Sequence, residues 1–243
     1  MVVARPFSVA LTAVVLLLAF LGGCLRPDYD PGVTAADFIA GIDNEWLPLV
    51  PGARWVYEAA TDEGLERIEV VVLPDTRDIE GVTATVVRDT VTLDGRLVED
   101  TYDWFAEDRA GNVWYLGEDS CEFDAAERCV DRSGSWEWGV DGALPGIVMW
   151  ADPVANGTAY FQEFYWREAV DEAAVIDAGR NVTVPAGTWE DTITTREWTR
   201  LDRTVEEEAT YVRGIGPILK EVTKGSETGQ AEQLIEFFIP PMG

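Results

Sequence analysis

The sequence predicts an all-β protein, a strongly curved antiparallel sheet or half-barrel with a short helix near its N-terminal end. Three observations predict this class. Short runs of alternating apolar and polar residues recur along the chain and are separated by Gly, Asp and Pro, as expected for successive antiparallel strands. No long segment has the apolar spacing of a helix. No segment has the strand–helix–strand pattern that parallel sheets require.

The elements are expected in a simple order. Residues 25–34 hold two Pro and one Gly without periodicity, which favours an extended tether. Thr34 is a candidate N-cap for a short helix near 34–41. Beyond Pro51-Gly52 the pattern changes to strands. These are expected at 54–60, 67–73, 82–93, 96–106 and 112–117, and, after a Gly- and Trp-rich stretch, at 159–166, 172–176, 181–184, 192–201, 204–212, 218–223 and 230–239.

The β region is expected to form a single domain. Ten Trp and an aromatic content of 11% supply enough large side chains for a packed core. No linker divides residues 44–239, and no repeat of fixed period is present. The predicted organisation is therefore a signal segment at 1–23, a tether with a short helix at 24–43, and one antiparallel β domain at 44–243.

The N-terminal segment is typical of a bacterial lipoprotein signal. Arg5 precedes the apolar run 7–21, and Gly22-Gly23 then lead into Cys24. In this pattern the cysteine becomes the lipidated first residue of an exported chain. Its acyl groups, palmitate among them, hold the chain at the membrane of the cell envelope. The alternative is a membrane-spanning helix. However, the apolar run is short for a span, and residues 26–28 are not a basic flank.

Charge and composition exclude several partners and mechanisms. The chain has 45 Asp and Glu against 18 Lys and Arg, and its net charge of −27 disfavours nucleic acid and anionic lipid head groups. Membrane attachment is therefore expected from the Cys24 lipid rather than from a basic patch. Because the chain has no His, Ser-His-Asp and Cys-His catalysis and zinc sites built on His are excluded. No motif indicates a metal or a cofactor, and none is expected.

Cys121 and Cys129 are expected to form a disulfide. They are the two cysteines left after Cys24, and an even pair in an exported chain is typical of a disulfide. The alternative is a metal or redox site with two cysteine ligands. That site would require a CxxC spacing or further ligands, and the sequence has neither.

Asp94-Gly95 lies between two alternating runs and predicts a hairpin with a two-residue turn. An uninterrupted hairpin places Asp89 directly opposite Asp100, on the apolar inward face that also carries Trp104. Two carboxylates on such a face repel each other, so one pKa rises unless a cation lies between them. The pair is a candidate site for a cation, a hydroxyl or an amine. The alternatives are a bulge that shifts the register, and an Arg from another strand that neutralises the pair.

The stretch 134–150 is too rich in Gly for a strand core and too aromatic for an ordinary loop. It has the side chains of a ligand pocket, with Trp136, Trp138 and Trp150 as candidate walls and Glu137 and Asp141 as candidate polar groups. Trp faces with carboxylates are also typical of a sugar-binding cleft. The alternative is a long connection that packs across the open end of the sheet, with its Trp residues as a plug.

Four stretches resemble a family of uncharacterised bacterial exported proteins. They are 42–57 (IDNEWLPLVPGARWVY), 103–115 (DWFAEDRAGNVWY), 134–142 (GSWEWGVDG) and 211–217 (YVRGIGP). The resemblance implies export and transfers no catalytic residue. A second resemblance, carried by 184–189 (VPAGTW) together with 211–216, is to lipoproteins with a curled half-barrel sheet such as the lipoprotein-carrier group. It implies a half-barrel fold.

The predicted function is that of a lipid-anchored envelope protein, non-enzymatic, which binds an apolar or amphipathic small molecule or a protein partner. The rival prediction is a glycan-active enzyme, because such enzymes work with two carboxylates and need neither His nor Cys. An open cleft lined by Trp, with two carboxylates about 5 to 10 Å apart, would favour the enzyme. A closed, dry interior would favour the binding protein, and a filled core without a cavity would favour a third possibility, a structural or partner-binding module.

Overall fold

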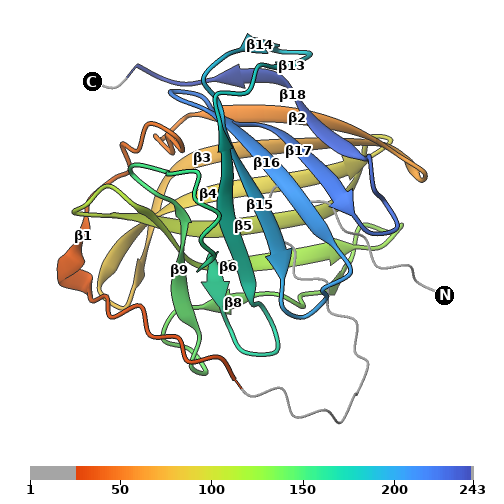
Figure 1. The fold of residues 1–243 in the computed structure, drawn as a ribbon. Coiled ribbons are helices and arrows are strands. Elements are labelled where there is room, and N and C mark those ends of the chain that lie inside the picture. Colours follow the sequence, from red (N-terminus) through yellow and green to blue (C-terminus); the bar gives the residue numbers. More distant parts are fainter. Residues whose placement is uncertain (1–25, 242–243) are drawn as a thin grey trace.

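The computed structural model describes residues 26–241, in which nearly all regular structure is antiparallel β-sheet (Figure 1). The strands of its 16-stranded sheet are β1 (Phe38–Ile39), β2 (Arg54–Thr61), β3 (Gly64–Ile79), β4 (Val82–Leu93), β5 (Arg96–Asp108), β6 (Val113–Phe123), β7 (Cys129–Asp131), β8 (Trp136–Glu137), β9 (Leu144–Met149), β10 (Tyr160–Phe161), β11 (Glu163–Phe164), β12 (Asp171–Ala178), β15 (Ile193–Thr199), β16 (Glu206–Val212), β17 (Gly216–Lys224) and β18 (Ala231–Phe238). A small second sheet pairs β13 (Val182–Val184) with β14 (Gly187–Trp189).

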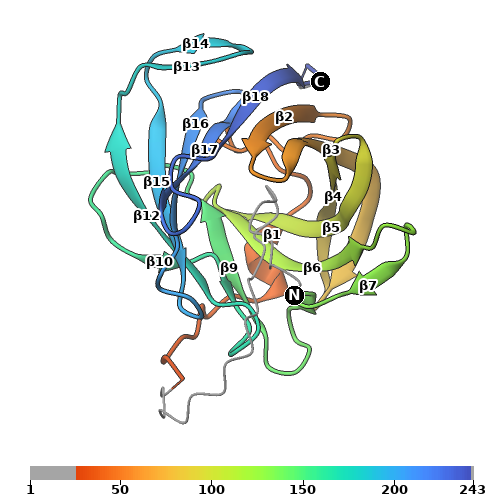
Figure 2. The same ribbon diagram turned by 90° about the vertical axis from the view of Figure 1, so that its right-hand side faces the viewer.

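The large sheet curls until its two ends nearly meet. Its strand order is β10-β12-β15-β16-β17-β18-β2-β3-β4-β5-β6-β9-β11. At one end Tyr160 pairs with Ala173 of β12, and a few residues later Phe164 pairs with Leu144 of β9 at the other end. One short stretch of chain therefore joins both ends. Figure 2 looks along the resulting barrel, with β2 to β6 and β12 to β18 as its two walls. The predicted antiparallel class is confirmed, and the sheet closes further than a half-barrel.

The predicted hairpin turn is present, but the predicted register is wrong. Asp94 and Gly95 have φ values of 49° and 81°, as a two-residue turn of type I′ requires. Beyond the turn, Thr92 pairs with Leu97, whereas Val91 pairs with Glu99, so a bulge inserts Val98. From there on the β5 residues exchange faces, because successive side chains of a strand point to opposite sides.

The bulge separates the two carboxylates that the uninterrupted hairpin placed together. Asp89 pairs with Thr101 and faces the barrel interior, where it is 2% exposed. Asp100 lies on the outer face, where its oxygens accept hydrogen bonds from Arg88 at 2.7 and 2.9 Å. Trp104 moves to the outer face as well. The physical reason is that the shifted register lets Asp100 pair with a cation near water instead of facing Asp89.

Two apolar clusters lie on the two faces of the sheet. The larger cluster fills the barrel around Trp55, Tyr57 and Ile68, which are 2% exposed or less. The second covers the outer face of β3 to β6 and β9, where Phe38 packs edge-to-face on Trp114. The N-terminal segment supplies Phe38, so it completes the outer cluster.

The predicted short helix near 34–41 is reduced to a single turn after Thr34, the predicted N-cap. The chain makes one 3₁₀ turn at Ala35–Asp37, in which the Asp37 carboxylate accepts hydrogen bonds from the Thr34 amide at 2.8 Å and hydroxyl at 2.9 Å. Phe38 then pairs with Asp108 of β5. A strand pair and burial of Phe38 replace the rest of the predicted helix.

Within the predicted tether, the Tyr29 ring lies 4.6 Å from that of Phe161.

Cys24 and the predicted signal segment 1–23 lie outside the described residues. Among residues 26–241, no helix has both the length and the apolar character needed to span a membrane.

Candidate functional site

The interior of the barrel is lined by carboxylates. Strand alternation turns Asp and Glu side chains of several strands inward, among the apolar residues of the larger cluster. Such groups are rarely buried unless they are paired, so their number here is unusual. The inward carboxylates that are 8% exposed or less are Glu66, Asp89, Glu99, Asp103, Glu107, Glu118, Glu163, Glu197 and Glu232.

A cavity of about 100 Å³ lies within this interior. One part of its wall is apolar and aromatic, including Trp55, Tyr57, Phe105 and Tyr211. The other part is polar and consists of Asp89, Asp103, Gln162, Glu197, Lys220 and Glu232. A cavity of about 150 Å³ holds benzene, so this one has room for a ligand of a few non-hydrogen atoms.

Lys220 is the one cation that lines the cavity among the described residues, and it is already paired. Its Nζ lies 2.7 Å from a carboxylate oxygen of Glu207. Burial acts to lower the pKa of Lys220, but the charges of Glu207, Glu197 and Glu232 outweigh burial, so the pKa is raised. Lys220 therefore stays charged in the interior.

Glu232 lies beside Lys220 on the neighbouring strand and is fully buried. Neither of its carboxylate oxygens accepts a hydrogen bond from the described residues. Burial raises the pKa of Glu232 to about 8, although the charge of Lys220 acts in the opposite direction. The side chain is therefore largely a neutral acid at pH 7.

A second group of buried carboxyls, which includes Asp103 of the cavity lining, lies toward β6 and β11. The Tyr115 hydroxyl donates to Asp103 at 2.6 Å, and the Trp136 indole N–H donates to Glu163 at 2.7 Å. Burial raises the pKa of Asp103 to about 7 against the effect of the Tyr115 hydrogen bond. Burial also raises the pKa of Glu118 and Glu163 well above the ordinary range, and the charges of neighbouring carboxylates add to it.

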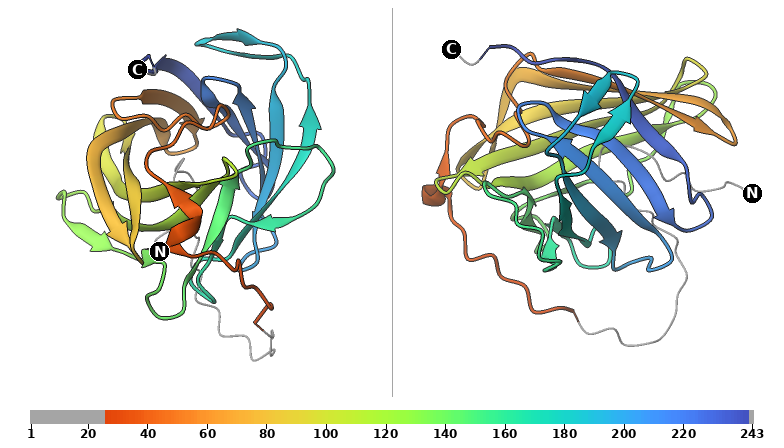
Figure 3. Two further views of the ribbon diagram at one scale, coloured as in Figure 1. Left: turned by 90° about the vertical axis from the view of Figure 1, so that its left-hand side faces the viewer. Right: turned by 45° about the horizontal axis from the view of Figure 1, so that its top comes forward.

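The segment 42–50 closes one end of the barrel. The backbone amides of Asp43 and Asn44 donate to Glu107, and the Glu45 carbonyl accepts a hydrogen bond from the Gly214 amide at 2.6 Å. The segment therefore joins the β5–β6 side of the opening to the turn between β16 and β17. Leu47 and Leu49 of this segment line the cavity. Figure 3 (left) shows the stretch, red to orange, crossing the end that faces the viewer.

The structure brings few of the predicted site residues together. Asp89 lines the cavity, whereas Asp100 and Trp104 lie outside, where Trp104 packs 4.0 Å from the guanidinium of Arg77. The predicted Trp-lined pocket in 134–150 is not assembled, because β8 and β9 of this stretch pair with β6 and their side chains alternate between the two faces.

The individual residues of that stretch have separate surroundings. Trp136 points into the barrel and contacts Tyr115 edge-to-face, with 5.4 Å between the ring centroids. Glu137 forms an ion pair with Arg77 at 2.5 Å. Asp141 is exposed in a turn, with φ of 51°. Trp150 packs against the Tyr160 ring at 5.3 Å, beside the outer cluster.

The sequence interpretation missed Lys220 and Glu232, although a signal was present. Lys220 is two residues from Ile218 and from Val222, and Glu232 is two residues from Leu234. These three apolar residues are 3% exposed or less. The period-2 pattern therefore places both ionisable groups on the inward face.

Among the described residues, no group of three or more Asp, Glu or Cys side chains is arranged to hold a metal ion.

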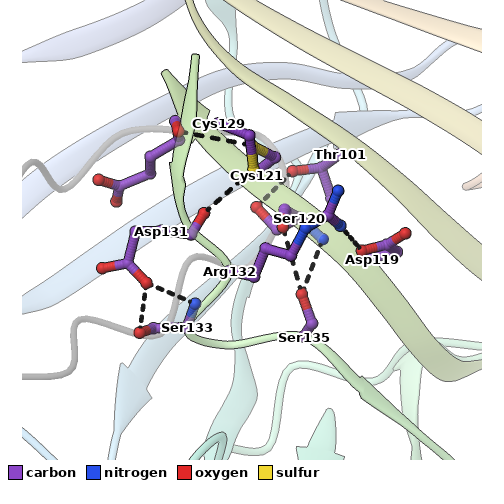
Figure 4. Close-up of polar contacts among 10 residues, drawn as sticks. Thr101, Asp119, Ser120, Cys121, Cys129, Asp131, Arg132, Ser133 and Ser135 are labelled. Atoms are coloured by element: carbon purple, nitrogen blue, oxygen red, sulfur yellow. Dashed lines mark hydrogen bonds and ion pairs between the residues drawn. A yellow bond between two sulfur atoms is a disulfide. The ribbon is translucent and has the colours of Figure 1, made fainter. Parts of the chain in front are cut away.

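The predicted disulfide between Cys121 and Cys129 is confirmed, with 5.7 Å between the Cα atoms. It ties the short strand β7 to the end of β6, as Figure 4 shows. In the same region, the Ser135 hydroxyl accepts a hydrogen bond from the Ser120 amide at 2.9 Å, and Arg132 pairs with Asp119. These contacts fasten the chain between β7 and β8 to the outside of the barrel, away from the cavity.

We expect that replacing both cysteines, in a Cys121→Ser/Cys129→Ser variant, lowers the free energy of unfolding by about 2.5 kcal/mol. The closed loop is short, and its conformational entropy in the unfolded chain accounts for this magnitude. Urea denaturation of the variant and of the oxidised protein measures the difference. Equal midpoints would contradict the expectation, and reduction of the unchanged protein should reproduce the effect of the double substitution.

No protein-family model matches this sequence, and no curated protein matches it. Two solved structures match the chain in part. A Bacteroides fragilis protein designated as exported, with a YmcC-like fold, is 13% identical, with a TM-score of 0.45 over 81% of this chain and 100% of its own. A Parabacteroides distasonis protein designated as a lipoprotein is 11% identical, with a TM-score of 0.37 and the same two coverages.

Proposed function

We propose that this protein is a non-enzymatic binding protein of the cell envelope whose barrel interior takes up a small amphipathic molecule. The observation that carries the proposal is the mixed lining of the cavity. Aromatic and aliphatic side chains line it together with ionisable groups. A ligand with one apolar and one polar end matches both kinds of side chain.

The energetics of the polar wall support binding rather than a purely structural role. Burying a carboxyl without a hydrogen bond is unfavourable, and Glu232 leaves both oxygens unpaired in the interior. A core selected for stability alone would hold an apolar residue at this position. A bound polar group would compensate for the lost hydration of Glu232.

The geometry supports this function better than the glycan-active alternative. Hydrolysis of a glycan requires two carboxylates in a cleft that a sugar chain can enter. The inward carboxylates of the described residues are 8% exposed or less. Of the Trp and carboxylate residues predicted to form a pocket in 134–150, Trp136 alone points into the barrel.

Reducing the cavity tests the proposal. Ala209 lines the cavity, so Ala209→Leu fills part of it, whereas Ala178→Leu adds the same atoms at an exposed position of β12. We expect native mass spectrometry of protein purified from its own cells to detect a bound small molecule in the unchanged protein and in Ala178→Leu. The occupancy should fall in Ala209→Leu. Equal occupancy in both variants would place the ligand elsewhere.

The membrane attachment is proposed from the sequence around Cys24. We expect Cys24→Ala to release the protein from the membrane fraction into the soluble exported fraction, because the acyl chains would supply the anchoring free energy. Fractionation followed by mass analysis of the N-terminal peptide measures this. Membrane retention of the variant with residues 1–23 still attached would show a spanning segment instead of a lipid anchor.

A further inference from the structure

We infer that the ligand of the barrel interior is a small organic cation, an alkylammonium whose N–H groups bind Glu232 and Gln162 while its apolar part lies against the aromatic wall. This inference rests on the proposed function and names the chemical class of its ligand. The hydrogen-bonding groups of the cavity lining narrow that class, because some are already used within the protein and others are not.

The aromatic donors of the lining are occupied within the protein. The Trp55 indole N–H donates to the Ile215 carbonyl at 2.7 Å. The Tyr57 hydroxyl donates to the Pro217 carbonyl at 2.9 Å, and the Tyr211 hydroxyl lies 3.4 Å from a Glu197 oxygen. A ligand that needs donors from the aromatic wall would therefore have to displace internal hydrogen bonds.

Some hydrogen-bond acceptors of the cavity lining, in contrast, have no partner among the described residues. Both oxygens of Glu232 and Oε1 of Gln162 are buried and accept no hydrogen bond from the described residues. Glu232 is fully buried and Gln162 is 2% exposed, and both line the cavity. In its ionised form Glu232 has only acceptors, as has Oε1 of Gln162, so the ligand that complements this form is rich in donors.

The charge of the lining selects a cationic donor. Asp89, Asp103, Glu197 and Glu232 line the cavity together with one cation, Lys220, which Glu207 neutralises. An ammonium group supplies three donors and one positive charge, and hydrogen bonds between charged partners are about twice as strong as neutral ones. The aromatic rings of the wall attract cations through their π faces. An anionic ligand would meet repulsion from most of the polar wall.

The size of the cavity limits the ligand to a few non-hydrogen atoms. At about 100 Å³, it matches n-butylammonium more closely than a lipid or a sugar chain. Two probes have nearly the same shape as n-butylammonium and a different charge: 1-butanol is neutral and butyrate is negative. The three molecules together separate the charge of the ligand from its size.

Calorimetric titration and the NMR signal of the Trp55 indole N–H provide the test. We expect n-butylammonium to bind at least about tenfold more tightly than 1-butanol at pH 8, and butyrate not to bind. Glu232→Gln should weaken n-butylammonium binding at least about tenfold. Glu236→Gln, on the same strand but exposed and paired with Arg54, is the matched control and should leave the affinity unchanged.

The pH dependence in the unchanged protein gives a second readout that needs no variant. Glu232 has a pKa of about 8, and it faces Lys220 of β17, Glu207 of β16, Glu66 of β3 and Glu99 of β5, with Tyr57 of β2 also close. Binding of a cation favours the ionised form, so a proton is released. We therefore expect the affinity for n-butylammonium to rise from pH 6 to pH 9, with proton release detected in buffers of different ionisation enthalpy.

The outcomes distinguish the inference from the proposed function. If 1-butanol binds as tightly as n-butylammonium, or if Glu232→Gln leaves the affinity unchanged and no proton is released, the cation assignment fails but the interior is still a binding site. If none of the three probes shifts the Trp55 signal and the purified protein carries no small molecule, the proposed function fails as well. Should Glu232→Gln not fold, Gln162→Met and the pH series decide the assignment.

Discussion

Lowering the pH from 8 to 5 is expected to stabilise the fold by several kcal/mol. Most proteins lose stability in acid because their carboxylates are paired in the native state. Here the buried carboxyls have the opposite tendency. Burial raises the pKa of Glu232 to about 8 and that of Asp103 and Asp171 to about 7.

The sign follows from the protons that each state binds. Between the ordinary carboxyl pKa and the raised value, the folded protein keeps a proton on each of these groups, whereas the unfolded chain has lost it. Folding therefore takes up protons, and the free energy of unfolding falls as the pH rises through this window. Each pKa unit corresponds to about 1.4 kcal/mol per group. The net charge of −27 acts in the same direction, because protonation reduces repulsion across the compact state.

Urea denaturation at pH 5, 6.5 and 8, with the disulfide oxidised, measures this dependence. Glu232→Gln should reduce the slope between pH 5 and 8, because the amide does not titrate. The exposed Glu236→Gln should leave the slope unchanged. A free energy of unfolding that is constant or rises between pH 5 and 8 would show that the interior carboxyls are solvated or paired. The pKa of some surface carboxylates, such as Asp177 beside Arg180, is lowered, so these groups favour the folded state at higher pH. Their contribution is small because they are exposed and solvent screens their charges.

Gly146→Ala is expected to open the barrel where its two ends meet. A Cβ atom at position 146 would lie 2.4 Å from the carbonyl carbon and oxygen of Gln162 and 2.6 Å from the Phe161 oxygen. These are backbone atoms of the stretch that joins β12 to β9, so no flexible side chain can move aside. We expect a loss of at least about 3 kcal/mol in the free energy of unfolding, at the upper end of the range for overpacking.

Gly142→Ala is the matched control for this prediction. Gly142 has a φ of 81°, which is unfavourable for Ala, but no neighbouring atom lies within 4 Å of the position that a Cβ would occupy there. The substitution should therefore lower stability by only about 1 kcal/mol, through backbone strain. If the effect at Gly146 is no larger than at Gly142, the close approach of β9 and the 160–164 stretch does not limit stability. Hydrogen exchange of β9 amides would locate the opening.

Local sequence patterns were sufficient for much of the fold. Strand β4 has the bounds that alternation predicts, Val82–Leu93, and the turn at Asp94-Gly95 is the predicted one. Both depend on neighbouring residues only: alternation along one strand, and two residues that tolerate positive φ. The pairing of Cys121 with Cys129 is equally local, since no third cysteine remains after Cys24.

The candidate site was predicted less well because its residues meet across the barrel. Asp89 was correctly placed on the inward face, but its expected partner Asp100 lies outside. Glu232 and Lys220 come from strands far along the chain from Asp89, and the pairing of β18 with β2 in the curled sheet brings them to one cavity. No spacing in the sequence records that proximity.

The sequence by itself therefore determined the antiparallel β class, most strand positions, the type I′ turn and the disulfide, because each follows from interactions between residues close in the chain. Tertiary structure alone decided the bulge at Val98, the closure of the barrel through 160–164 and the choice of buried carboxyls. The physical reason is that the free energy of a bulge or of a desolvated carboxyl depends on neighbours in adjacent strands. For Asp100 that neighbour is Arg88, and for Glu232 it is Lys220.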